Sequence, residues 1–335
     1  MDNDKPRLTI TIELTGDAAA NLQRRAAQHQ MSPQTLVARY LKGYLAPERE
    51  DVLHFLESME PRFLRWQERF PGVRFGETAQ QPSQGSLQLL NEIGQKIIAV
   101  PSSLPDWTQN FVQNHTSRIA HDLDLLRPLL QPGKRILDVG AAPYLLSGGL
   151  KTLGHDVIGL DLDPKRHAMA IELLGLEVLA CNIETEPWPL ESDCFDIIVF
   201  NELFEHLRIN PIHTMREALR VLAPGGHLTL STPNLRSLEG LLAFLTEDRA
   251  MSGGGSIYEE YSKLEALGHM GHVREYTLTE VADFMHKVGF RLVQVTYRGR
   301  RVGLRRGSRR RPNWRPFVSL IFDFPIGPDI TAHGV

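Results

Sequence analysis

The chain has 335 residues, of which 42% are hydrophobic, and its formal net charge at pH 7 is −3. This length allows one large domain plus a small one, and the charge balance excludes a strongly basic protein. Two cysteines, Cys181 and Cys194, are too few for a disulfide framework. Neither a signal peptide nor an apolar run long enough to span a membrane is evident, so we expect a cytoplasmic protein.

The first predicted elements are a strand and two helices. Residues 8–14 alternate apolar and polar side chains, which indicates a strand with one buried face. Two helices are predicted next, at residues 17–30 and 32–45. Asp17 is the start signal of the first, and Ser32-Pro33 is that of the second. Three such short elements make too small a core to fold alone.

This order of elements resembles the ribbon-helix-helix module of bacterial DNA-binding regulators. The resemblance implies a homodimer formed through residues 1–47, in which the strand pairs with its twin. Thr9 and Thr11 would then face a DNA groove, but Glu13 would face the phosphates. A carboxylate is unfavourable there, which favours dimerisation over DNA binding.

The middle of the chain changes character at residue 111. Residues 48–110 contain helical patches and a loop rich in Gly, Gln, Ser and Pro, and we interpret them as a helical linker or substrate cap. From residue 111 onward, apolar strands alternate with helical stretches, which predicts an α/β domain with a parallel sheet covered on both faces. The predicted strands are residues 135–140, 156–162, 177–183, 195–200, 226–233 and 290–297.

The first two of these strands end in residues that suit a nucleotide-like ligand. Asp138-Val-Gly140 leads from a strand into a helix, and glycine there lets the backbone approach a ligand. Asp161 ends the next strand, where a carboxylate can accept hydrogen bonds from two ribose hydroxyls. A dinucleotide enzyme has the same pair, so these residues alone leave both classes open.

The segments at residues 181–207 and 216–234 follow at intervals that resemble class I S-adenosylmethionine methyltransferases. The resemblance covers about residues 115–335, and we place the domain at residues 111–335. It implies a Rossmann-like, seven-stranded sheet that binds S-adenosylmethionine. The implied contacts are Asp138, Gly140 and Ala142 to the methionine end, Asp161 with Leu162 to the ribose, Asn182 and Ile183 beside the adenine, and Asn201 beneath the methionine.

Three positions depart from the pattern of this family. Ala142 and Tyr144 stand where the second and third glycines of the loop are usual, and Asn182 replaces a common acid. Asparagine can still hydrogen-bond an adenine amine. An alternative is a degenerate fold that no longer binds the cofactor, although the ribose acid Asp161 is present.

The stretch NELFEHL follows the fourth strand of this domain and carries the most chemistry. Glu202, Glu205 and His206 would share one face of a helix beginning there. Carboxylates and imidazoles suit Mg²⁺, Mn²⁺ or Zn²⁺, and His269 or His272 could complete the ligand set.

The spacing Glu-x-x-Glu-His, followed by Thr-Pro-Asn at 232–234 and a later histidine, resembles two metal-dependent families. These are the small-RNA terminal 2′-O-methyltransferases and the ubiquinone-pathway phenol O-methyltransferases. The resemblance implies a metal site of Glu202, Glu205, His206 and His272. The alternative is a metal-free pocket in which the acid shapes the cofactor site and His206 or His272 acts as general base.

Residues 298–315 hold nine arginines and no acid. They form either a solvated loop or a surface that attracts phosphate, on nucleic acid or on a carrier-linked sugar, with Trp314 available for stacking. After them we predict a short helix at 317–324 and a last strand at 328–335.

These patterns together predict an S-adenosylmethionine-dependent methyltransferase that modifies oxygen on a small sugar, phenol or polyol. Two alternatives stay open, an RNA 2′-O-methyltransferase and a DNA-associated regulator that senses S-adenosylmethionine. A sensor has no need of converging carboxylates and imidazoles, which favours the enzyme.

Overall fold

The computed structural model describes residues 16–28, 30–37, 70–77, 81–237, 240, 249–250, 256–267, 271–298 and 317–323. The chain forms two compact units, Met1–Arg69 and Phe70–Val335. In the first unit, α1 (Gly16–Gln28) and residues 33–37 are helical, where the sequence predicts two helices. The strand predicted at 8–14 lies outside the described residues, and the domain boundaries at 47 and 110 stay predictions.

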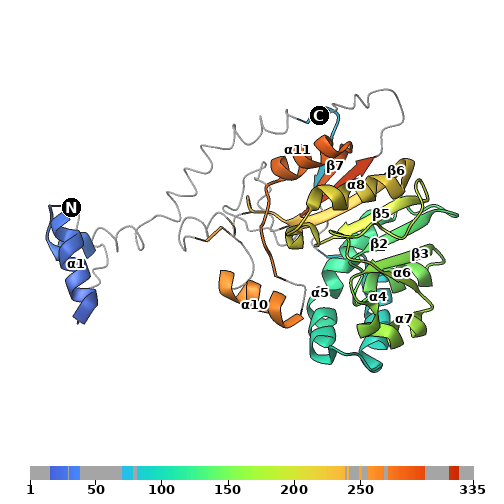
Figure 1. The fold of residues 1–335 in the computed structure, drawn as a ribbon, viewed down its shortest axis with the longest axis horizontal. Helices are drawn as coiled ribbons and strands as arrows, with labels where there is room; N and C mark the ends of the chain where they lie inside the picture. The colour runs from blue at the N-terminus through green and yellow to red at the C-terminus, as the bar shows by residue number, and fades with distance from the viewer. Residues whose placement is uncertain are drawn as a thin grey trace, which may run out of the picture. The chain divides into compact units, whose positions relative to one another are not determined.

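The second unit is built on an eight-stranded sheet with the order β1-β7-β8-β6-β5-β2-β3-β4 (Figure 1). β8 runs antiparallel to both of its neighbours, and the other pairs are parallel. This is the Rossmann-like α/β sheet that the sequence predicts. The strands are β1 (Arg74–Glu77), β2 (Arg135–Val139), β3 (Asp156–Asp161), β4 (Glu177–Ala180), β5 (Phe195–Asn201), β6 (Leu222–Pro233), β7 (Arg291–Arg298) and β8 (Phe317–Asp323).

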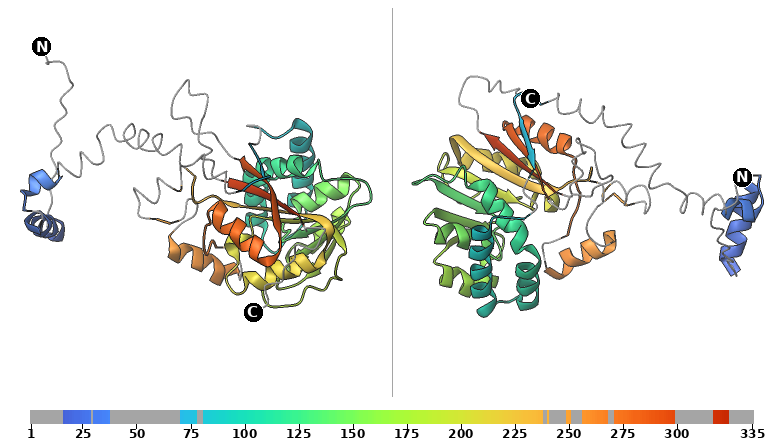
Figure 2. Two further views of the ribbon diagram at one scale, coloured as in Figure 1. Left: turned by 90° about the horizontal axis from the view of Figure 1, so that it is seen from above. Right: turned by 180° about the vertical axis from the view of Figure 1, so that it is seen from behind.

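Helices cover both faces of the sheet, as Figures 1 and 2 show. One face carries α4 (Gln84–Ala99), α5 (Pro105–Leu126), α6 (Leu145–Thr152) and, after the 3-10 helix η1 (Pro164–His167), α7 (Ala168–Leu174). The other face carries α8 (Pro211–Val221) and α11 (Leu278–Val288), and α10 (Ile257–Leu267) precedes α11. No helix among the described residues combines the length and apolar character needed to cross a bilayer.

Local sequence fixes where these helices begin. Thr277 and Glu280 form a reciprocal capping box at the start of α11. α8 begins with proline after Asn210, whose side chain accepts a hydrogen bond from His213 N at 3.0 Å. The start of α8 is therefore set directly after the loop that contains the Glu-His motif.

The main core lies between the central strands and the α4–α7 layer. Its strands are nearly continuous apolar runs because helices bury them from both sides. The fully buried members include Leu90, Ile93, Ala120, Leu123, Ile136, Leu145, Leu150, Val157 and Val199. This packing leaves the carboxyl ends of the parallel strands to carry polar residues.

Two parts of the predicted topology are wrong. Residues 317–323 form strand β8 rather than a short helix, since this apolar run pairs with β6 and β7 through its whole length. Strand β1 lies inside the segment that the sequence indicates as a loop, and it adds an eighth strand at the sheet edge. The strand predicted at 328–335 lies outside the described residues.

Candidate active site

The turn after β2 favours glycine for two reasons. Gly140 has a φ of +68°, and a Cβ at this position would lie 2.8 Å from Leu203 Cδ2. A side chain there would strain the left-handed backbone and would require Leu203 to move. The turn after β2 therefore packs directly on the loop that follows β5, which brings two predicted site segments together.

Asp138 is buried beneath this turn and is 5% exposed. Its Oδ2 accepts a hydrogen bond from Ser147 Oγ at 2.5 Å, at the start of α6. Burial raises the pKa of Asp138 to about 7, against the opposing effect of the Ser147 hydrogen bond. Asp138 thus fixes the loop–helix junction from below.

Asp161 ends β3 next to the same turn. Its Oδ2 accepts a hydrogen bond from Ala142 N at 3.3 Å, and its Oδ1 accepts one from Asp163 N at 3.0 Å. Leu162 beside it is 41% exposed. Each carboxylate oxygen keeps further acceptor capacity, which suits a ligand with neighbouring hydroxyls.

Tyr144 explains how the loop tolerates the absence of its third glycine. Its backbone is left-handed, with a φ of +71°, and its side chain is fully buried against the edge of His167. Within the described part of the chain, its hydroxyl has no hydrogen-bond partner. Burial, reinforced by Asp161 and Asp138, raises the pKa of Tyr144, so the hydroxyl remains a donor among acids.

The β4–β5 loop, residues 181–194, holds Asn182 and Ile183. Asn182 Oδ1 accepts a hydrogen bond from Glu184 N at 3.2 Å, and Ile183 O accepts one from Trp188 Nε1 at 3.3 Å. These contacts turn the side chain of Asn182 back toward its own loop. Asn182 and Ile183 stay a prediction as adenine neighbours.

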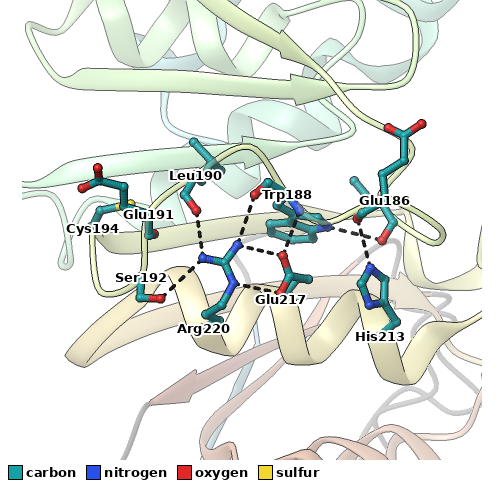
Figure 3. A network of polar contacts seen from close by, with 10 residues as sticks. Glu186, Trp188, Leu190, Glu191, Ser192, Cys194, His213, Glu217 and Arg220 are labelled. Carbon is teal, nitrogen blue, oxygen red and sulfur yellow. Dashed lines mark hydrogen bonds and ion pairs between the residues drawn. The ribbon is translucent and has the colours of Figure 1, made fainter.

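The β4–β5 loop is fastened to α8 by Arg220 and Glu217 (Figure 3). Arg220 donates to Leu190 O at 2.8 Å and to Trp188 O at 3.2 Å, and it pairs with Glu217 at 2.7 Å. Glu217 also accepts a hydrogen bond from Trp188 N at 2.8 Å. The buried Trp188 side chain and these hydrogen bonds hold this end of the loop against α8.

The β5–α8 loop, residues 202–210, does not begin as an α-helix, contrary to the prediction of one helical face. Glu202 has a φ of +49°, and a 3-10 helix, η2, follows over Phe204–His206. After this bend, Glu202 does not share a helical face with Glu205 and His206. Asn201, the last residue of β5, lines a small pocket together with Asp122 and Thr296.

Glu202 belongs to a buried ionic network. Arg298 donates to Glu202 Oε1 at 2.6 Å and to Asp122, while Arg118 lies 2.8 Å from Glu202 Oε2. Ser231 Oγ also donates to Glu202 Oε1, at 2.7 Å. We name Arg118, Asp122, Glu202 and Arg298 the ionic network; its two positive and two negative groups balance.

Arg298 occupies an unexpected place in this network. Its side chain is 2% exposed, whereas the sequence groups it with a solvated or phosphate-facing arginine segment. That grouping is wrong for Arg298, because the residue is the last of β7 and points into the protein. The other arginines of the segment lie outside the described residues.

Glu205, His206 and His272 form a second cluster beside the network. One ligand atom from each lies within 4.8 Å of the others. The rings of the two histidines meet edge to face with centroids 4.9 Å apart. Two contacts hold residues 271–273 against residues 205–206. Val273 N donates to Glu205 O at 2.9 Å, and the side-chain Nδ1 of His206 lies 3.0 Å from Gly271 O. His269 lies outside the described residues.

The donor atoms of this cluster suit a cation. Glu205 is fully buried; its Oε2 accepts from Thr232 Oγ1 at 3.0 Å, while Oε1 has no hydrogen-bond partner among the described residues. His206 Nδ1 lies 3.0 Å from Gly271 O and 3.4 Å from Gly271 N. Donation to the nearer atom, Gly271 O, would leave Nε2 unprotonated, as metal ligation requires. Glu202 is drawn away by two guanidinium groups, so three of the four predicted ligands converge. The metal site stays a prediction.

The pKa values of Glu205 and Glu202 shift in opposite directions. Burial, with Glu202 nearby, raises the pKa of Glu205 to about 8. Burial would also raise the pKa of Glu202, but Arg118 and Arg298 outweigh it and lower this pKa. Burial, followed by the nearby His272, lowers the pKa of His206 to about 4, which keeps that imidazole neutral.

His272 has the opposite tendency. Burial alone would lower its pKa, but Glu275 and Glu205 outweigh this effect and raise it. Its Nδ1 lies 3.5 Å from Glu275 Oε1, at the outer limit of a hydrogen bond, and its backbone N donates to Glu260 Oε2 at 2.9 Å. Gly271, with a φ of +150°, lets the chain pass close to Glu260, where a Cβ would collide.

Several residues of the site were not found from the sequence. Thr232 could have been suspected from the Thr-Pro-Asn segment. Arg118 and Asp122 lie on a helix whose sequence has no motif, and no local signal pairs them with a bend after β5. Only the fold brings these distant positions together.

A family model described as "Methyltransferase domain" matches residues 110–295. Because this is more than half of the chain, the protein belongs to the methyltransferase domain family. S-adenosylmethionine is the cofactor of the methyltransferase class that the sequence predicts.

Curated relatives match the central part of the chain. A ubiquinone biosynthesis O-methyltransferase of Cereibacter sphaeroides is 34% identical over 116 residues, which cover 34% of this chain and 47% of the relative. A protein of the same name from Roseobacter denitrificans is 30% identical over 153 residues, covering 44% of this chain and 61% of the relative. The chain thus spans about half the length of the first of these relatives.

Solved structures are more distant in sequence. A methyltransferase from Thermotoga maritima is 20% identical, with a TM-score of 0.46, over 66% of this chain and 96% of that one. One from Archaeoglobus fulgidus is 15% identical, with a TM-score of 0.46, over 64% of this chain and 98% of that one.

The residues at the ends of β2 and β3 fit the cofactor. Gly140 leaves the turn without a side chain, and Asp161 offers carboxylate acceptors beside it. The buried Tyr144 hydroxyl, unpartnered within the described residues, supplies a donor that a polar ligand can satisfy. A glycine turn beside an acidic strand end is compatible with a nucleoside ligand, and the cofactor-binding residues stay a prediction.

Proposed function

We propose that this protein is an S-adenosylmethionine-dependent O-methyltransferase of a small acceptor bearing neighbouring hydroxyls, of the phenol, polyol or sugar type. The observation that carries the proposal is the convergence of Glu205, His206 and His272, two of them in the loop whose Leu203 packs on the Gly140 turn. The name of the curated relatives supports transfer to oxygen.

The residues of the chain divide the work by position. Asp138, Gly140 and Ala142 would hold the methionine end of the cofactor, and Asp161 with Leu162 would hold the ribose. Bound cofactor supplies an activated methyl group. A divalent cation on Glu205, His206 and His272 would lower the pKa of the acceptor hydroxyl. His206 and His272 would orient that oxygen, and without a cation one of the two imidazoles would accept its proton.

Turnover against a panel of acceptors tests this proposal. S-adenosylhomocysteine formation would be measured with a catechol, a polyol, a nucleotide-linked sugar, an RNA ending in a 2′,3′-diol, and no acceptor. We expect acceptor-dependent turnover with at least one small diol. Turnover with RNA alone would replace this proposal with the RNA 2′-O-methyltransferase, and no turnover with any acceptor would favour a sensor.

Replacing Asp161 with alanine is expected to weaken S-adenosylmethionine binding more than tenfold, since charge-assisted ribose contacts are worth about 2 kcal/mol. Isothermal titration calorimetry would measure the dissociation constant. Asp156→Ala is the matched control, because Asp156 is an exposed acid at the opposite end of the same strand. Equal affinity for Asp161→Ala and wild type would refute the pocket assignment.

We also propose that the chain is a cytoplasmic homodimer that pairs through residues 1–47. The support is the alternating strand pattern at 8–14 and the small core of that segment. Light scattering should give a dimer for the full chain and a monomer for a chain beginning at residue 48. A monomeric full chain would contradict the ribbon-helix-helix interpretation.

A further inference from the structure

Glu184 makes an unusual contact between two loops of the active site. It lies in the β4–β5 loop, is 8% exposed, and presents one carboxylate oxygen, Oε1, to three successive backbone N–H groups. Arg208 N, Ile209 N and Asn210 N donate to it at 2.8, 2.6 and 3.1 Å. An ionised acceptor makes such hydrogen bonds stronger than a neutral one does.

The Glu184 contact lies between the predicted adenine site and the predicted cation site. Glu184 N donates to Asn182 Oδ1, so the predicted adenine neighbour is fixed by the same residue. On the other side, Arg208 stands two positions after His206, a member of the cation cluster. Thr214 on α8 adds a second tie by donating to Ile183 O at 3.1 Å. Glu184 therefore lies on a short chain of bonded groups between the two sites.

The far end of the β4–β5 loop is bonded to α8. Figure 3 shows the contacts of Arg220 and Glu217 there, and His213 Nε2 lies 3.0 Å from Glu186 O. At the near end, Glu184 joins the loop to residues 208–210. A ligand that displaces Asn182 or Ile183 would therefore act on residues 208–210 through Glu184.

We propose that Glu184 is a positioning residue that couples cofactor binding to the geometry of the Glu205–His206–His272 cluster. Cofactor seated on the β4–β5 loop fixes Glu184, and Glu184 fixes residues 208–210 and with them the end of η2. This inference rests on the proposed cofactor and cation sites. Its consequence is that cofactor and cation bind with positive cooperativity, which is reciprocal.

The competing explanation is that Glu184 only satisfies free N–H groups before α8. Asn210→Ala separates the two roles, because it removes the side-chain cap from α8 and leaves the Glu184 contact with the backbone in place. Glu184→Met removes the acceptor oxygen at nearly constant shape. Glu184→Gln keeps an oxygen at the Oε1 position and serves as the rescue.

The test is calorimetry of Mn²⁺ binding with and without S-adenosylhomocysteine. In wild type and in Glu184→Gln we expect S-adenosylhomocysteine to tighten Mn²⁺ binding about tenfold, within the usual range of coupling. In Glu184→Met this factor should fall below about twofold, while Asn210→Ala keeps it. Unchanged coupling in Glu184→Met, or equal losses in Glu184→Met and Asn210→Ala, would overturn the proposal.

Hydrogen exchange provides a readout that does not require a cation. S-adenosylhomocysteine should slow exchange of the amides of residues 208–210 in wild type and not in Glu184→Met. If wild type binds no Mn²⁺ but shows this protection, the cation site fails and the coupling through Glu184 stands. Absence of protection in wild type that has bound S-adenosylhomocysteine would reject the coupling, and absence of S-adenosylhomocysteine binding would reject both proposals.

Discussion

Replacing Arg298 with methionine is expected to lower the free energy of unfolding by about 3 to 5 kcal/mol. Methionine fills much of the same volume but leaves the carboxylates of Asp122 and Glu202 without their shared partner. Those acids would then be buried beside a single guanidinium, Arg118, which contacts Glu202. Urea unfolding followed by circular dichroism gives the change directly.

An exposed ion pair provides the control for Arg298. Lys287 pairs with Asp283 on α11 with its side chain 72% exposed, so Lys287→Met should cost no more than about 1 kcal/mol. Arg298→Lys should fall between the two, since one ammonium cannot reproduce the forked contact with two carboxylates. A loss for Arg298→Met as small as that for Lys287→Met would show that the ionic network does not hold β7 to α5 and the β5–α8 loop.

The bounds of the strands are predictable where a long apolar run lies between turn residues. Strands β2, β3 and β5 lie within one or two residues of their predicted bounds, because buried parallel strands are continuous apolar runs between turn residues. Residues 317–323 carry a run of the same kind, but a short apolar run has no period that separates strand from helix. β1 is only four residues long and lies among glycines, so its pairing with β7 depends on the tertiary fold.

The site was predictable in its residue types and not in its pairings. The Glu-x-x-Glu-His spacing draws attention to Glu205, His206 and the distant His272, whose ligand atoms lie within 4.8 Å of one another in the structure. The same spacing assigns Glu202 to that group on the assumption of a regular helix. The left-handed residue at 202 breaks this assumption, and the acid instead meets Arg298, 96 positions away.

The pairing of Glu202 changes what a cation site can contain. Two guanidinium groups already neutralise this carboxylate, so the positive charge of a cation would gain little from it. Glu205 has the opposite situation, with one buried oxygen that lacks a partner among the described residues. A ligand set of one carboxylate and two imidazoles leaves positions open for the acceptor oxygens, as catalytic metal sites require.

Wild-type turnover is therefore expected to disappear on chelation with EDTA and to return with Mg²⁺, Mn²⁺ or Zn²⁺. Glu205→Gln and His272→Ala should each slow methyl transfer at least about 100-fold, because even the residues that orient metal ligands are worth 10- to 100-fold. S-adenosylmethionine affinity should stay within about twofold of wild type, since these side chains act on the acceptor oxygen. Steady-state turnover and calorimetry on the same preparations separate the two effects.

Two further variants decide which acids and histidines bind the cation. Glu202→Gln should leave Mn²⁺ affinity nearly unchanged while lowering stability, because Glu202 serves the ionic network. His286→Ala removes an exposed imidazole from α11 and controls for adventitious metal binding.

Full activity of the wild type in EDTA would contradict the cation site. His206 and His272 would then be the candidate general bases.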